Sequence, residues 1–104
     1  MITRRMATQA GRITYSIVHN KAAQRFETEW EGHTAVLEYN MGEKTIVFTH
    51  TGVPPVMEGK GVGSSLCAAG IEYAKENKLD IQPQCWFVDR YMQKKNISRS
   101  PSSL

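Results

Sequence analysis

The segment from Ile46 to Ala74 constrains the fold most, because its residue pattern changes type twice within a short distance. A run of mostly β-branched and aromatic residues at 46–51 predicts a strand. Glycines then alternate with other residues at 59, 61 and 63, and small or apolar residues recur every three or four positions from Gly63 onward. That spacing predicts an amphipathic helix of about four turns, with Asn77 as its C-terminal stop.

A strand, a glycine loop and a helix in this order form an anion site. The first N–H groups of a helix have no intrahelical partner, and the helix dipole adds partial positive charge at the same end. Glycines let an anion approach the backbone closely, so phosphate is the expected ligand of this loop, and Lys60 adds a cation beside it. The alternative is that the glycines only shape the turn into the helix.

The rest of the chain predicts an α+β domain in which consecutive strands form an antiparallel meander. Phe26, Thr28 and Trp30 alternate with glutamates, as in a half-buried strand. Further strands are predicted at 13–20, 34–39 and 44–52, and after the helix at 79–85, where Pro83 indicates an edge. A short helix is predicted at 86–95, with its aromatic residues Trp86, Phe87 and Tyr91 in the core.

Length and charge predict one domain with basic ends. Residues 1–12 carry a charge of +3 and residues 90–104 a charge of +4, whereas residues 13–89 carry −4. We expect a flexible N-terminal segment at 1–12, the folded domain at 13–95 and a disordered basic, serine-rich tail at 96–104. Neither end mixes basic with aromatic residues, so nucleic-acid binding is not expected. Apolar runs are too short for a membrane span, and we expect a cytoplasmic protein, or a cytoplasmic and nuclear one in a eukaryote.

The two cysteines, Cys67 and Cys85, do not form a disulfide framework. The histidines and cysteines also lack the spacing of metal ligands, so no metal is expected. Cys67 follows Leu66 on the predicted helix and is expected in the core. Buried cysteine in a strand is usually a small hydrophobic residue, which is the plain interpretation of Cys85.

Three separated motifs together resemble the small YjdJ-type branch of the GNAT acetyltransferase superfamily. They are His50-Thr51-x-Val53-Pro54, then Gly59-Lys60-Gly61-Val62-Gly63-x-x-Leu66, then Pro83-x-Cys85-x-Phe87-Val88-x-x-Tyr91. The resemblance covers about residues 17–92 and implies a minimal GNAT-like fold, with acetyl-CoA as co-substrate. Glu58 departs from the superfamily pattern, where Gln or Arg is usual, and a carboxylate there repels a pyrophosphate.

The resemblance also implies roles for individual residues. The pyrophosphate of CoA would lie on the loop and the pantetheine arm along the end of the preceding strand. The cofactor-binding residues are then Thr51, Gly52, Val53, Glu58, Gly59, Lys60, Gly61, Val62, Gly63 and Ser64. Cys85 would lie near the thioester as an acetyl acceptor or a proton donor to the departing thiol. Tyr91 is a candidate for lining the acceptor site.

His50 is the second catalytic candidate, because the ordinary pKa of histidine suits a general base for an amine. The alternative is a strand histidine that is hydrogen bonded to its neighbours. We therefore expect an acetyl-CoA-dependent N-acetyltransferase acting on an unidentified amine. The alternatives are a non-catalytic acyl-CoA-binding or protein-interaction module that keeps the fold, and an unrelated nucleotide-binding domain. Neither the acceptor nor the oligomeric state follows from the sequence.

Overall fold

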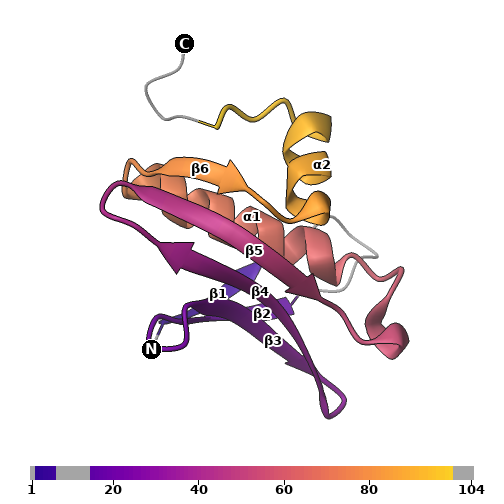
Figure 1. Cartoon of the computed structure of the whole chain (residues 1–104). Coiled ribbons are helices and arrows are strands. Elements are labelled where there is room, and N and C mark those ends of the chain that lie inside the picture. Colours follow the sequence, from indigo (N-terminus) through magenta and orange to yellow (C-terminus); the bar gives the residue numbers. More distant parts are fainter. Residues whose placement is uncertain (1, 7–14, 100–104) are drawn as a thin grey trace.

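The computed structural model describes residues 2–6 and 15–99, which form a six-stranded sheet with two helices. The strands lie in sequence order across the sheet (Figure 1). They are β1 (Ile2–Met6), β2 (Tyr15–Asn20), β3 (Arg25–Trp30), β4 (His33–Met41), β5 (Thr45–Gly52) and β6 (Asp80–Pro83). A 3₁₀ turn, η1 (Pro55–Met57), and the helices α1 (Val62–Glu76) and α2 (Trp86–Lys94) complete the fold.

Strands β2 to β5 form the expected antiparallel meander, which confirms the α+β fold class, and β1 adds one further antiparallel strand to it. The last strand differs in direction, since β6 pairs with β5 in parallel. The reason is that α1 carries the chain back along the sheet between them, as a parallel connection requires. As Pro83 indicated, β6 is an edge strand.

The core lies between α1 and one face of the sheet. Alternate strand residues point into it, among them Ile17, Phe26, Leu37 and Phe48. Gly70 of α1 sits against them so closely that a Cβ there would lie 2.9 Å from Phe48 Cε1 and 3.0 Å from Leu37 Cδ2. Because Gly70 has no side chain, α1 packs closely against β4 and β5 at this point.

Several element boundaries and burials differ from the predictions. Residues 1–12 were expected to be flexible, but residues 2–6 form β1, which pairs with β2; residues 1 and 7–12 lie outside the described part. Strand β4 continues through Met41, so its hairpin turn falls at 42–44, closed by the Gly42 N–H on the Thr45 carbonyl at 2.7 Å. Trp86 was expected in the core but is 69% exposed, because the next residue, Phe87, takes the inward position instead.

The C-terminal tail was expected to be disordered from residue 96. Within the described residues it continues as an ordered segment to Arg99. The Ile97 N–H donates to the Met92 carbonyl at 2.9 Å, and the Ile81 N–H on the outer edge of β6 donates to the Arg99 carbonyl. Residues 100–104 lie outside the described part. The tail therefore covers part of the β6 edge.

Candidate functional site

The central feature of the site is an opening between β5 and β6. Their pairing ends at Phe48 and Pro83, and the last link across it is the Cys85 N–H, which donates to the Phe48 carbonyl at 2.9 Å. The chain then turns away into α2, while β5 continues to Gly52 (Figure 1). Of the described strands, only β4 pairs with β5 beyond this point, so one backbone edge of β5 is left without a strand beside it.

A β-bulge marks the start of this opening. Glu38 of β4 lies opposite His50, whereas the next residue, Tyr39, lies opposite Phe48, so Thr49 is the extra residue in β5. Bulges bend a strand and redirect its side chains. Here the bulge coincides with the point where β5 parts from β6, and it presents the last residues of β5 to the opening.

Cys85 lies at the entrance of this opening, half-buried, as the N-cap residue of α2. Its Sγ is 3.3 Å from Oγ1 of Thr51 in β5, a hydrogen bond that crosses from one side of the opening to the other. The sulfur therefore faces the free edge of β5. The two residues are 34 positions apart, and only the fold brings them together.

The surroundings of Cys85 lower the pKa of its thiol below the ordinary value. Burial alone would raise that pKa, but the Thr51 hydroxyl and the backbone N–H groups of Val88, Phe87 and Thr51 outweigh burial by stabilising the thiolate. The Cys85 side chain makes no capping hydrogen bond to the first turn of α2. The helix N–H groups therefore act on the thiolate through the partial positive charge that they direct at the sulfur. Thiolate is the nucleophilic form of cysteine, and this position favours it.

Cys67 has the opposite environment and is a core residue, as expected. Burial, together with the neighbouring Cys85, raises the pKa of its thiol to about 12. A thiol held in its protonated form is neither a nucleophile nor a metal ligand. The two cysteines thus differ in chemistry because of their surroundings.

The glycine loop leads from η1 into α1 and lies at the far end of β5. Gly59 and Gly61 have φ of +76° and +81°, and a Cβ at either position would point into open space. Gly61 is the N-cap residue of α1, so the N–H groups of the first turn, at Val62, Gly63 and Ser64, have no intrahelical partner. The Tyr15 hydroxyl at the start of β2 anchors the loop by donating a hydrogen bond to the Lys60 carbonyl at 2.8 Å.

Gly63 is a glycine for a different reason. A Cβ there would lie 2.7 Å from Cζ of Phe87, so the absence of a side chain lets the first turn of α2 pack against the first turn of α1. We predicted Gly63 as a residue of the anion loop. Its N–H belongs to the first turn of α1, but its side-chain position is set by the contact between the two helices.

The two charged residues of the loop lie on its exposed surface. The Lys60 ammonium is 5.4 Å from the centre of the Trp30 ring, so its side chain leans against the end of β3. Glu58 is exposed and ends η1, with its N–H on the Pro55 carbonyl. Lys60, the predicted cation, and Glu58, which departs from the superfamily pattern, thus lie on the same open loop.

His50 is not brought together with Cys85. In the β4–β5 pairing Leu37 lies opposite Thr51 and Glu38 opposite His50, so successive residues of β5 face opposite sides of the sheet. Thr51 therefore shares the core face with Leu37 and reaches Cys85, whereas the exposed His50 points away from it, with Nε2 only 3.3 Å from where a Cβ on Gly52 would lie. The sequence offered no sign of this separation, because the extra residue at Thr49 is not visible in the pattern.

The remaining predicted residues lie along the same path. Thr51, Gly52 and Val53 are half-buried and connect the opening to the loop, with Val53 packed against the core. Tyr91 of α2 also packs against the core, where burial and the nearby Cys67 raise its pKa. No sequence pattern predicted the contacts of Thr51 with Cys85 and of Gly63 with Phe87, because they join residues distant in the chain.

A metal site needs several ligating side chains close together, and a helix that spans a membrane has to be long and apolar. No three His, Cys, Asp or Glu side chains in the described part gather closely enough to hold a metal ion. Neither described helix is long and apolar enough to cross a membrane. The candidate site consists of the free edge of β5, the glycine loop and Cys85.

This α+β domain, with an opening between two parallel strands and a glycine loop at a helix N-terminus, has a GNAT-like fold. A family model of GCN5-related N-acetyltransferases matches residues 25–99, so the chain belongs to this family. It is also similar to Protein NATD1 of Xenopus tropicalis, with 29% identity over 79 residues that cover 73% of this chain and 72% of that protein. Protein NATD1 of Mus musculus and of Homo sapiens are each 27% identical over 79 residues, covering 73% of this chain and 72% and 70% of those proteins.

Proposed function

We propose that the protein is an acetyl-CoA-dependent N-acetyltransferase of the small, single-domain YjdJ-type branch of its family. One observation carries the proposal: the free backbone edge of β5 leads from Cys85 to the open glycine loop at the N-terminus of α1. An extended thioester ligand with a pyrophosphate at one end fits this arrangement. The pantetheine arm hydrogen bonds to the β5 edge as an added strand would, and the pyrophosphate accepts from the loop and first-turn N–H groups.

The thioester of such a ligand lies beside Cys85. In the direct route, the amine nitrogen attacks the carbonyl carbon, the C–S bond breaks, and the proton that the amine loses is taken up by the CoA thiolate. A backbone N–H in the bulged part of β5 stabilises the charge that develops on the carbonyl oxygen. Holding amine and thioester in place supplies most of the acceleration.

Cys85 offers a second route with the same overall balance. Its thiolate attacks the thioester carbon, CoA leaves as the thiolate and is protonated, and the acetyl group is held on Sγ. The amine then attacks this acetyl group, releases the Cys85 thiolate and loses its proton to solvent. The lowered pKa of Cys85 supports this route over proton donation, since it increases the fraction of thiolate, which is the nucleophilic form.

Calorimetric titration with acetyl-CoA, and separately with CoA, tests the binding step. Ser64→Asp adds a carboxylate to the exposed first turn of α1. There it interacts favourably with the helix dipole, so the helix stays folded, but it repels a pyrophosphate. We expect saturable binding by the unmodified protein and binding weakened about tenfold or more by Ser64→Asp. Ser16→Asp, at an exposed position of β2, is the matched control and should bind as the unmodified protein does.

Intact-mass measurement after incubation with acetyl-CoA tests the chemistry. The Cys85 route predicts one added acetyl group, which Cys85→Ala abolishes. Release of CoA thiol in the presence of amines, with Cys85→Ala unimpaired, would support the direct route and remove Cys85 from the mechanism. Binding without turnover for any amine class would favour the non-catalytic acyl-CoA-binding module, and no binding by the folded protein would overturn the proposal.

A further inference from the structure

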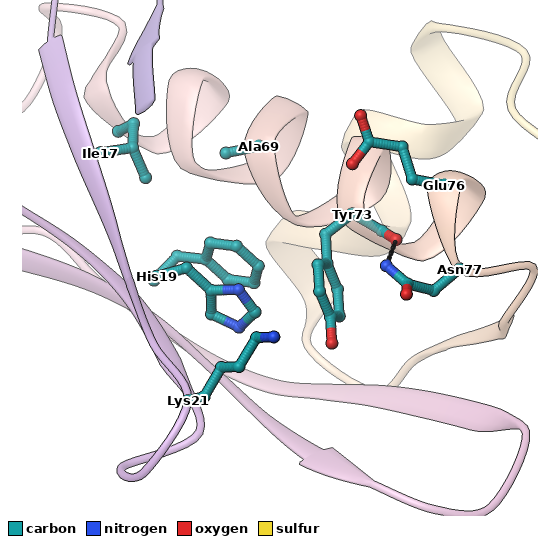
Figure 2. A pocket seen from close by; sticks show the side chains of 8 residues that line it. Ile17, His19, Lys21, Ala69, Tyr73, Glu76 and Asn77 are labelled. Carbon is teal, nitrogen blue, oxygen red and sulfur yellow. Dashed lines mark hydrogen bonds between the residues drawn. The ribbon is translucent and has the colours of Figure 1, made fainter. Parts of the chain in front are cut away.

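A cavity lies at the opposite end of α1 from the glycine loop. Its volume is about 210 Å³, and it opens between β2, β3 and the last turns of the helix (Figure 2). Tyr73 in its wall is eleven residues beyond Val62, which corresponds to about 17 Å along the helix axis. The cavity is lined by Ile17, His19, Lys21, Phe26, Ala69, Tyr73, Glu76 and Asn77. It is separate from the opening between β5 and β6.

The walls of the cavity form an aromatic corner. The His19 ring stacks on Phe26 with centroids 4.0 Å apart and planes at 14°, and it meets the Tyr73 ring at 4.4 Å and 76°. Figure 2 shows the His19 and Tyr73 rings next to each other in the lining of the cavity. Two rings at a steep angle can receive a third ring, which lies edge-on to one and is offset-stacked on the other.

Two hydrogen bonds fix the positions of the side chains in this corner. The buried His19 forms a hydrogen bond of 2.6 Å between its Nε2 and the hydroxyl of Tyr39 in β4, which fixes the plane of the imidazole. On the other side, the Asn77 amide donates to the Tyr73 carbonyl at 2.8 Å and closes the last turn of α1 (Figure 2). A preformed site loses little conformational freedom when it binds.

Lys21 places a positive charge at the mouth of the cavity. The Lys21 ammonium lies 5.7 Å from the centre of the Tyr73 ring, and in Figure 2 its side chain extends beneath His19 toward Tyr73. The Glu76 carboxylate, the acidic group of the lining, points away from that mouth in the same view. The charge facing a ligand in the corner is therefore positive.

We propose that this cavity binds a small aromatic carboxylate, with its ring in the His19–Tyr73 corner and its carboxylate on Lys21. The volume is below the roughly 300 Å³ of sites for drug-sized ligands, so it suits a single ring with a short acidic substituent. The aromatic walls select the ring, and the ammonium selects the charge. The proposal does not depend on acetyl-CoA binding, since it involves neither the glycine loop nor Cys85.

Titration of the ¹⁵N-labelled full chain with sodium benzoate, followed by NMR, tests the proposal. We expect saturable shifts at His19, Tyr73 and Asn77 and none in the glycine loop. Benzamide, which has the ring without the charge, and cyclohexanecarboxylate, which has the charge without the aromatic ring, should each bind about tenfold more weakly. These two ligands separate the contributions of Lys21 and of the aromatic corner.

Lys21→Gln provides the matched variant, because Lys21 is exposed and its replacement leaves the core intact. It should weaken benzoate binding to the level of benzamide and leave benzamide binding unchanged. Lys75→Gln, an exposed lysine of α1 that does not line the cavity, should change neither. Equal affinity for benzoate and benzamide, an unaffected Lys21→Gln variant, shifts elsewhere, or the absence of saturable shifts would each overturn the proposal.

Discussion

Residue chemistry in this protein depends on neighbours that are distant in the chain. Cys67 and Cys85 are the same residue type, yet burial raises the pKa of Cys67 to about 12, while the contacts of Cys85 outweigh its burial and lower its pKa. The difference comes from one strand residue, Thr51, and one helix N-terminus. A cysteine at a helix N-terminus with a hydroxyl partner is the arrangement that favours thiolate.

Thr51→Val should raise the pKa of Cys85, because it removes the hydroxyl that stabilises the thiolate while the opposing effect of burial remains. The pH dependence of alkylation by iodoacetamide, followed by peptide mapping, measures that pKa. The midpoint should move to higher pH, and Cys67 should stay unreactive in the folded protein. Thr49→Val, whose hydroxyl donates to the Glu38 carbonyl instead, is the control, and an equal shift in both variants would contradict the assigned role.

At the scale of elements, the first turns of α1 and α2 meet at a single glycine. Gly63 leaves room for the Phe87 ring, whereas Gly59 and Gly61 in the loop before it are glycines because of their positive φ. Neighbouring glycines thus serve two purposes. The contact of the helices fixes where α2 begins, and therefore where its N-cap residue Cys85 lies relative to β5.

Gly63→Ala should destabilise the fold by about 1–3 kcal/mol, because its Cβ would lie 2.7 Å from Cζ of Phe87. Urea unfolding measures the change. Phe87→Leu shortens the side chain that the new Cβ would meet, so adding it to Gly63→Ala should recover part of the lost stability. The double variant should therefore be more stable than the sum of the two single changes predicts. Gly59→Ala is the matched control: it meets no atom, and only its positive φ opposes the change. A cost for Gly63→Ala that Phe87→Leu leaves unaltered would contradict the helix–helix explanation.

At the scale of the whole molecule, buried acidic groups couple stability to alkaline pH. Burial, with a contribution from Tyr73, raises the pKa of Tyr39 from 10.0 to about 12, and burial raises that of Cys67 from 9.0 to about 12. The unfolded chain releases these protons at lower pH than the native protein does. The stabilisation is therefore complete below about pH 9 and is lost as pH rises toward 12.

The free energy of unfolding should accordingly fall between about pH 8 and about pH 11, when urea unfolding is measured at constant ionic strength. Tyr39→Phe should be less stable at the lower pH, because it removes the hydroxyl bonded to His19, but its stability should decline less steeply with pH. A free energy that stays constant or rises over this range would contradict the assigned burial effects.

The sequence by itself determined the order and type of most elements. The alternation at Phe26, Thr28 and Trp30 predicted β3, and the three- and four-residue spacing from Gly63 to the stop at Asn77 predicted α1. The motifs predicted the GCN5-related N-acetyltransferase family, although not its YjdJ-type branch, which stays a prediction. These signals succeed because strand and helix periods are local and depend on residues only a few positions apart. Glycine with positive φ is likewise a local requirement, so the loop was visible in the sequence.

Only the tertiary structure decided which residues meet. The bulge at Thr49 turns His50 to the face opposite Thr51, and the inward position of Phe87 leaves Trp86 in solvent. The pairing of Thr51 with Cys85 and the aromatic corner around His19 join segments that are far apart in the chain. Such contacts depend on register and on the packing of α1 and α2, which no local pattern encodes, since one extra residue in a strand reverses the face of every side chain after it.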